Sequence, residues 1–260
     1  MSVPDIAARA CETFLSELDS RAPGLAEGLY LCGSVALDDF HPPGSDVDFV
    51  AVLSRRPDAA EMTALAAAHA QVRRRHPGVR YEGIHLTRDQ LAVGPDCGPV
   101  PCAFGKRFLP EGRFALNPIT WHELATIGVP IRPAADLKVP TGVDAIRAYS
   151  RANLTAYWQP WSRAARRPSV IALFAASRGG TPWCVLGVSR LHHAIATGTL
   201  TSKSGAGRYA RDVFDACWHP IVDEALRIRA NQPPEYGALR RRRDALAYLD
   251  MAIDSALALP

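Results

Sequence analysis

The chain has no apolar run long enough to cross a membrane. Its longest run, residues 170–176, is far short of the roughly 20 residues that a transmembrane helix needs. The first ten residues, MSVPDIAARA, contain an acid and lack the apolar core of a signal peptide. We therefore expect a cytoplasmic protein that does not span a membrane.

The sequence also lacks the cysteine and histidine patterns of disulfide frameworks and zinc sites. Its six cysteines are scattered and form no CxxC pair, so we expect reduced thiols and no zinc site. His192 and His193 are the only adjacent histidines. Successive residues of a helix point about 100° apart, so these two rings do not converge on one metal ion.

A strong charge of either sign is missing as well. Of the 260 residues, 30 are basic and 26 are acidic, which gives a formal net charge of +4. This balance is far from that of a dedicated nucleic-acid-binding protein. The hydrophobic content of 48% and the length allow one or two globular domains. We expect two domains, a monomer and no nucleic-acid partner.

The first half of the sequence mixes helical and strand patterns. Apolar residues recur at helical spacing over residues 5–20 and 58–75. Short apolar segments, rich in β-branched and aromatic residues, predict strands at 29–32, 46–53 and 79–86. The first half is therefore expected to form a mixed sheet with flanking helices.

The second half shows helical periodicity and little strand signal, over residues 143–158, 183–197, 207–230 and 238–258. Between the halves, residues 129–142 contain three prolines and no periodic pattern, which predicts a domain linker. We therefore expect an α+β protein. Its N-terminal domain would cover residues 1–138, and a C-terminal all-α helical bundle domain would cover residues 139–260.

The most informative segment is residues 29–53. It runs from a strand through Gly33 and Ser34 and a loop to Asp46 and Asp48, which open a second strand. Residues two apart on a strand share a face, so both carboxylates leave the same side. At about 4 Å they repel by roughly 4 kcal/mol at an effective dielectric constant near 20. In apolar surroundings one of the two carboxyls should therefore be protonated, or a cation should bind between them. Their oxygen ligands suit Mg²⁺.

The Gly-Ser pair offers a place for phosphate. Gly33 lets the backbone approach a ligand closely. A helix that begins after it would present unpaired N–H groups and a positive dipole end to an anion. Ser34 and Ser45 add hydroxyl donors. Together with the two acids, these features predict a site for a nucleoside triphosphate and Mg²⁺.

The order strand, Gly-Ser, loop, Asp-x-Asp, strand resembles that of the polymerase-β-type nucleotidyltransferase superfamily. Here 11 residues separate Ser34 from Asp46. That pattern has a third carboxylate on a later strand, and Glu82 is unusual as a glutamate inside an apolar strand. The resemblance implies that Glu82 takes part in metal binding and accepts the proton of an attacking hydroxyl. The alternative is a surface charge on an edge strand.

The element order, the length and the helical second half resemble the streptomycin/spectinomycin (aminoglycoside) adenylyltransferases. Residues 187–203 are similar to that family's helix with an Arg, an Ala-Thr-Gly and then a Lys. The resemblance implies that Arg190 and Lys203 contact the phosphates of ATP, the co-substrate, while Asp46, Asp48 and Glu82 hold Mg²⁺ as two ions. The alternative for each cation is a solvated surface side chain.

One stretch departs from that family. Its members present acidic residues in the helical domain to a polycationic drug, whereas this chain has no Asp or Glu between Asp144 and Asp212. The same stretch contains ten Arg and Lys residues, which would attract a triphosphate and repel an aminoglycoside. Aromatic residues at 158–161 would give that region an apolar surface instead.

The expected function is Mg²⁺-dependent transfer of AMP from ATP to a hydroxyl of a small molecule, with release of pyrophosphate. By resemblance, the first acceptor class is an aminoglycoside or aminocyclitol antibiotic, and the outcome is resistance. A second hypothesis keeps the chemistry and changes the acceptor to another natural product, a protein hydroxyl or an RNA end. A third is a nucleotide-binding regulator without turnover.

Overall fold

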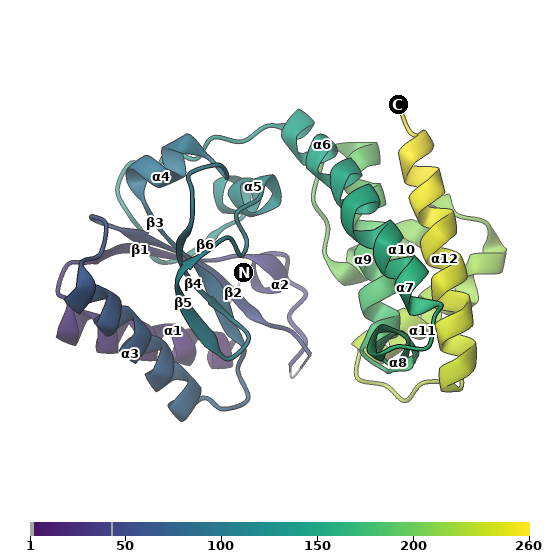
Figure 1. Ribbon diagram of the computed structural model, residues 1–260, viewed down its shortest axis with the longest axis horizontal. Helices are drawn as coiled ribbons and strands as arrows, with labels where there is room; N and C mark the ends of the chain where they lie inside the picture. Colours follow the sequence, from purple (N-terminus) through teal and green to yellow (C-terminus); the bar gives the residue numbers. More distant parts are fainter. Residues whose placement is uncertain (1–2, 43) are drawn as a thin grey trace. The chain divides into compact units, whose positions relative to one another are not determined.

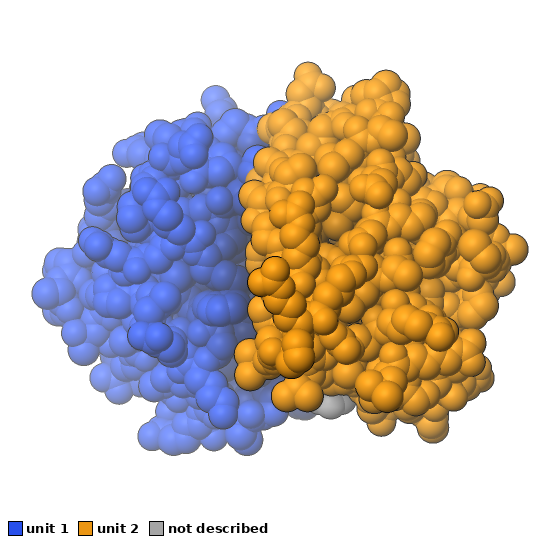
Figure 2. All heavy atoms as spheres, turned by 45° about the vertical axis from the view of Figure 1, so that its right-hand side comes forward, with its two compact units in different colours: residues 1–142 blue, residues 143–260 orange. Residues whose placement is uncertain are grey.

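The computed structural model describes residues 3–42 and 44–260, and the chain divides into two compact units, residues 1–142 and 143–260 (Figures 1 and 2). The first unit contains α1 (Asp5–Arg21), β1 (Ala26–Leu31), α2 (Gly33–Ala36), β2 (Val47–Leu53), α3 (Ala59–Arg75), β3 (Tyr81–Thr87), α4 (Arg88–Val93), β4 (Val100–Phe104), β5 (Arg107–Gly112), α5 (Pro118–Thr126) and β6 (Val129–Arg132).

The six strands of the first unit form one mixed sheet in the order β5-β4-β3-β2-β1-β6. β2 and β3 are parallel and are connected through α3, whereas the other neighbouring strands pair antiparallel. Parallel neighbours need such a crossover because their like ends lie at the same edge of the sheet. The two strands predicted to carry the acids are therefore adjacent and central.

Each face of this sheet has its own apolar core. Phe49 and Ala51 of β2 belong to the core that α1 and α3 cover. Val50 and Val52 belong to the opposite core, together with Trp121 of α5. This is the alternation that a strand buried on both faces requires. Figure 1 shows α1 and α3 on one side of the sheet and α4 and α5 on the other.

The edge strand β6 corrects the prediction of a linker over residues 129–142. Residues 129–132 pair antiparallel with β1, and Val129 and Ile131 pack against the core. Proline is unfavourable in a central strand, but an edge strand tolerates Pro130 because one side of its backbone needs no partner. The sheet therefore extends into the segment that was predicted to connect the domains.

Every secondary-structure element assigned within residues 143–260 is a helix. This second unit contains α6 (Val143–Asn153), the π-helix η1 (Leu154–Trp158), α7 (Gln159–Ala165), α8 (Val170–Ala176), α9 (Gly180–Thr197), α10 (Lys203–Val213), the 3₁₀ turn η2 (Ala216–Trp218), α11 (His219–Arg229) and α12 (Ala238–Ala258). Buried residues of α9 and α12 form the centre of its core. The mixed sheet with flanking helices and the helical second half confirm the α+β fold class.

No helix among residues 3–42 and 44–260 combines the length and the apolar character that crossing a bilayer requires. Most helices instead have a buried side and an exposed, charged side. In α12, for example, Leu249 and Ile253 are buried, whereas Arg240 and Arg243 are exposed. The helices thus bury one side in the unit's own core.

Candidate active site

Asp48 and Glu82 lie opposite each other on adjacent strands. The parallel register of β2 and β3 pairs the Cα atom of Asp48 with that of Glu82. Side chains alternate along a strand, so both carboxylates leave the face that Val50 and Ile84 also occupy. Asp46 lies directly before β2, and its negative charge raises the pKa of Glu82, so it lies near the same two acids. The three acids therefore lie at the beginning of the two central strands.

Gly33 lies directly against the Asp48 carboxylate. A Cβ atom at this position would collide with Asp48 Oδ2, and the backbone has a φ of +58°, which an L side chain rarely adopts. The short helix α2 begins at this glycine. The backbone N–H of Gly33 donates to Oε2 of Glu123 at 3.1 Å. Only glycine meets both conditions, so the Gly-Ser turn and the acid on β2 form one local structure.

Glu123 is a residue of this site that the sequence analysis did not find. It lies on α5 and is buried, although it is ionisable. Burial raises the pKa of the neighbouring Cys32 thiol well above its usual range, and the charges of Glu123 and Asp48 raise that pKa further. Glu123 is 90 residues from Gly33 in the chain, so no local spacing pattern points to their contact.

Arg80 is the second residue that the sequence analysis overlooked. Its guanidinium forms an ion pair with Asp46, and one of its Nη atoms donates to the Gly44 carbonyl at 3.0 Å. The Arg80 side chain is 53% exposed. The ion pair of Arg80 with Asp46 therefore lies at the surface, where solvent reaches the guanidinium.

Glu82 is 6% exposed and accepts a hydrogen bond from the Gly105 backbone N–H at 2.9 Å. Burial raises the pKa of its carboxyl above the usual range, and the negative charge of Asp46 raises this pKa further. The Gly105 N–H and the Arg80 guanidinium lower the pKa in part. The net effect is a carboxylate that holds a proton more strongly than a solvated glutamate does.

The two serines have structural partners in the loop between α2 and β2. Ser34 Oγ donates to the Asp46 carbonyl at 3.4 Å. Ser45 Oγ accepts the backbone N–H of His41 at 3.0 Å, and the His41 ring in turn contacts Asp39 at 2.9 Å. These contacts hold the loop that delivers Asp46 to the start of β2.

Arg190 and Lys203 lie close together in the second unit. Arg190 is on α9, and its Nε donates to the Thr201 carbonyl at 3.2 Å, just before Lys203 opens α10. Ser202 caps α10 by accepting the Gly205 N–H at 3.0 Å. Both cations are partly exposed. The α9–α10 turn therefore presents two positive charges.

The three acids have the chemistry that a divalent cation needs. Their carboxylate oxygens are hard ligands of the kind that Mg²⁺ prefers. Over residues 3–42 and 44–260, however, no three His, Cys, Asp or Glu side chains are gathered in the arrangement of a metal site. Asp46 instead forms an ion pair with the Arg80 guanidinium. The donor set fits Mg²⁺ once Asp46 exchanges that partner.

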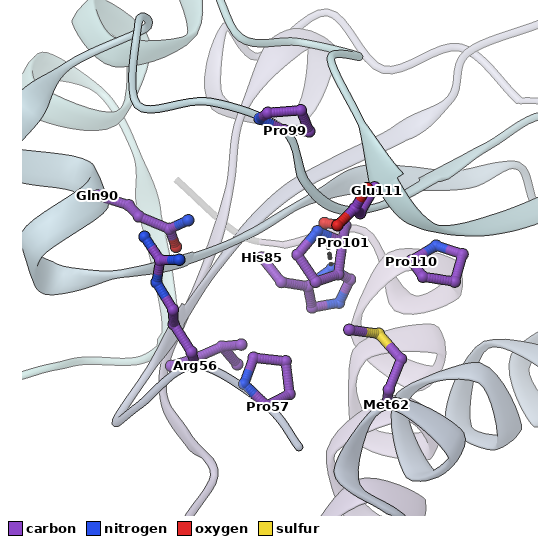
Figure 3. Close-up of a pocket in the computed structure, with 10 residues that line it drawn as sticks. Arg56, Pro57, Met62, His85, Gln90, Pro99, Pro101, Pro110 and Glu111 are labelled. Carbon is purple, nitrogen blue, oxygen red and sulfur yellow. Dashed lines mark hydrogen bonds between the residues drawn. The ribbon is translucent and has the colours of Figure 1, made fainter. Parts of the chain in front are cut away.

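A cavity of about 470 Å³ opens elsewhere on the first unit (Figure 3). Leu53 at the far end of β2 lines it, whereas Asp48 lies near the beginning of that strand. His85 also lines it and occupies the sheet face opposite to Glu82, as strand alternation predicted. The cavity is therefore separate from the three acids.

The mixed sheet and the helical second unit together have the fold of a solved nucleotidyltransferase. Among solved structures, the chain is similar to the crystal structure of the spectinomycin adenyltransferase AAD(9) from Enterococcus faecialis with ATP and spectinomycin. The TM-score is 0.68 and the sequence identity 14%, with 95% of this chain and 98% of that chain covered. No protein-family model and no curated protein matches the chain.

This likeness confirms the resemblance at the level of the fold, over nearly the whole length of both chains. At 14% identity it does not extend to the substrate or to individual residues.

Proposed function

We propose that this protein transfers AMP from ATP to a hydroxyl of a small molecule and releases pyrophosphate. The observation that carries this proposal is the pairing of Asp48 with Glu82 on adjacent parallel strands, with Asp46 directly before β2 and Gly33 against Asp48. The fold, shared with an adenyltransferase whose structure contains ATP, supports the same reaction class.

In this proposal Glu82 is the general base. It accepts the proton of the acceptor hydroxyl while the hydroxyl oxygen forms a bond to the α-phosphorus of ATP. The bond from that phosphorus to the bridging oxygen of the β-phosphate breaks, and pyrophosphate leaves with the electron pair. The raised pKa of Glu82 favours this role, because a stronger base draws the hydroxyl proton more effectively.

Asp46, Asp48 and Glu82 are the residues that would hold Mg²⁺, in two ions on this proposal. When bound there, Mg²⁺ would act as a Lewis acid and would neutralise negative charge that develops on the triphosphate. The chain's own contribution is to hold Asp48 and Glu82 on one sheet face and to keep Gly33 free of a side chain beside Asp48.

The triphosphate is assigned to two sets of residues. Gly33, Ser34 and Ser45 belong to the proposed nucleotidyltransferase domain, residues 1–138. Arg190 and Lys203 belong to the proposed helical domain, residues 139–260, which clamps substrate and nucleotide. The partial exposure of Arg190 and Lys203 supports this role, because a cation must reach solvent to meet a phosphate.

The acceptor has two candidates. An aminoglycoside or aminocyclitol antibiotic is supported by the neighbour's spectinomycin, and its adenylylation would confer resistance in the cytoplasm of the host. An acceptor of another class is supported by the absence of Asp and Glu between Asp144 and Asp212, since those acids would be needed to hold a polycation.

The test is pyrophosphate release from ATP and MgCl₂, with spectinomycin, streptomycin and uncharged alcohols as acceptors and with mass spectrometry to detect the AMP adduct. We expect acceptor-dependent release that Asp48→Asn abolishes. The matched control is Glu111→Gln, which removes an exposed carboxylate of the same unit and should leave the rate unchanged. If pyrophosphate is released with none of these acceptors, the alternative of a nucleotide-binding regulator without turnover is favoured.

A further inference from the structure

Two acids of the candidate site belong to a row of side chains that crosses four strands of the first unit. The register of β2 and β3 pairs Asp48 with Glu82. β3 and β4 are antiparallel, and their register, continued by one residue, sets Phe104 opposite Glu82. β4 in turn pairs Phe104 with Arg107 of β5. The row therefore runs from Asp48 through Glu82 and Phe104 to Arg107.

All four side chains of this row leave the same face of the sheet. Cys102, two residues before Phe104, belongs to the apolar core on the face that carries Asp48 and Glu82. Leu109, two residues after Arg107, packs against the same core. Side chains two residues apart on a strand point the same way, so Phe104 and Arg107 share this face with the acids.

A two-residue turn fixes the second half of the row. Gly105 and Lys106 connect β4 to β5, and Gly105 has a φ of +61°, the left-handed value that the first position of a type II′ hairpin turn requires. A Cβ there would meet nothing within 4 Å, so the backbone conformation is what favours glycine. The Gly105 N–H donates to Glu82 Oε1 at 2.9 Å. The turn thus ties Phe104 and Arg107 to the proposed base.

Phe104 is an exposed ring beside a buried carboxylate. It is 53% exposed, whereas Glu82 is 6% exposed. The Phe104 ring packs against that of Phe114, with the centroids 4.5 Å apart. Phe114 in turn packs against the core of this sheet face. The Phe104 ring is therefore supported from the protein side and open to solvent, where it can stack with a ring of a bound molecule.

Arg107 supplies a positive charge at the end of the row. It is exposed, and within the part of the chain that the structure describes its guanidinium takes part in no hydrogen bond or ion pair. Neighbouring strands lie about 4.8 Å apart, so the backbone of Arg107 is roughly 10 Å from that of Glu82. Lys106 adds a second exposed cation in the turn. An anionic group is therefore attracted to this end of the row.

The two ends of the row suit different substrates. Gly33, to which the triphosphate is assigned, lies against Asp48 at the first end. Phe104 and Arg107 lie on the other side of Glu82. A hydroxyl that gives its proton to Glu82 can therefore belong to a molecule that extends over Phe104 toward Arg107, away from the triphosphate.

We propose that Phe104 and Arg107 bind the acceptor, and that the acceptor is a hydroxyl compound with a flat apolar ring and an anionic group at its far end. This inference rests on the proposed function and names its substrate class. The hydroxyl meets Glu82, the ring stacks on Phe104, and the anion pairs with the Arg107 guanidinium.

The test compares 4-(hydroxymethyl)cinnamate with its neutral amide, 4-(hydroxymethyl)cinnamamide. Both molecules have the hydroxyl and the second polar group at opposite ends of one flat ring system, and they differ in charge. Calorimetry with the full-length protein, in MgCl₂ and without ATP, measures their binding. We expect the carboxylate to bind about three- to tenfold more tightly than the amide, as one charge-assisted contact predicts.

Variants separate the two contacts. Arg107→Gln should abolish the preference for the carboxylate. Arg56→Gln is the matched control, because Arg56 is another exposed arginine of the first unit and lines the separate cavity. Phe104→Leu should weaken both ligands about three- to tenfold, whereas Phe104→Tyr keeps the ring and should retain them. All three positions are exposed, so we expect the urea unfolding midpoints to stay unchanged.

The proposal is overturned if the amide binds as tightly as the carboxylate, if neither binds, if Arg107→Gln keeps the preference, or if Phe104→Leu binds both ligands normally. It is also wrong if Arg107→Gln weakens ATP instead, because the anion at this end would then be the triphosphate. Carboxylate binding as expected, but no pyrophosphate release with any acceptor, would contradict the proposed reaction and leave this surface standing. Release with other acceptors and no carboxylate binding would do the reverse.

Discussion

At the scale of single residues, Glu82 has to meet two demands that oppose each other. A base must lose its proton near neutral pH, yet it must hold a proton strongly enough to remove one from a hydroxyl. Burial and the charge of Asp46 raise its pKa, while the Gly105 N–H and Arg80 lower it. The proton affinity of the Glu82 carboxylate therefore lies between that of a solvated glutamate and that of a glutamate that never loses its proton.

This balance predicts the outcome of Glu82→Gln. The amide keeps the shape and can still accept the Gly105 N–H, but it cannot take up a proton. We expect kcat to fall by about 10²- to 10⁴-fold, the usual contribution of a general base. The affinity for Mg²⁺-ATP, measured by calorimetry, should fall much less than kcat, because Asp46 and Asp48 would still hold the metal ion. A near-normal kcat in this variant would show that another group removes the hydroxyl proton.

At the scale of elements, the turn from β1 into α2 is built against β2. Gly33 has a positive φ, and its missing Cβ makes room for the Asp48 carboxylate. Its N–H is fixed by Glu123 of α5. The β1–α2 turn, β2 and α5 thus determine where Asp48, a proposed metal ligand, lies. A side chain at Gly33 would move the Asp48 carboxylate.

A comparison of Gly33→Ala with Gly24→Ala should separate the cost of a positive φ from the effect of a Cβ that collides with Asp48. Gly24 also has a positive φ, +73°, but a Cβ there would meet nothing within 4 Å. Both variants should lose about 1–2 kcal/mol of unfolding free energy from the left-handed backbone. Only Gly33→Ala should also lose most of its turnover. The comparison needs urea unfolding and a pyrophosphate assay, and equal activity in the two variants would rule out a role for the close approach to Asp48.

Local patterns were sufficient to predict part of this site. The two-residue alternation predicted that Asp46 and Asp48 share a face, and the parallel pairing of β2 with β3 brought Glu82 opposite Asp48. The strand pattern around Glu82 predicted that this residue lies on a strand, whereas its place opposite Asp48 depends on how the two strands pair. The phosphate roles of Arg190 and Lys203 come from the resemblance and stay a prediction.

Contacts between distant segments could not be predicted in this way. Glu123 reaches Gly33 only because α5 covers the sheet face that carries Val50. Arg80 had a weak signal, since it lies two residues before Glu82, but its ion pair with Asp46 depends on the neighbouring strand. β6 was missed because Pro130 breaks a strand pattern everywhere except at a sheet edge.

At the scale of the whole molecule, both units bury histidines that must remain neutral. In the first unit His69 and His85 are buried within 3.2 Å of each other, Nε2 to Nε2, among aromatic rings. Burial lowers the pKa of His85 to about 4 and that of His69 well below its usual range. In the second unit, burial lowers the pKa of His192 to about 4. The unfolded chain, in contrast, takes up these protons near pH 6.5.

The sign of the resulting pH dependence follows from proton linkage. Above about pH 6.5 neither state binds these protons, and the stability is complete. Between about pH 6.5 and 4 the unfolded chain is protonated first, so the unfolding free energy should fall with pH, by at most about 3 kcal/mol for His85 or His192. Urea unfolding across this range measures the slope. His192→Gln should make it shallower, because Gln can still hydrogen bond near Tyr209 and Ser255 but cannot titrate. An unchanged slope would mean that His192 already binds its proton in the folded state.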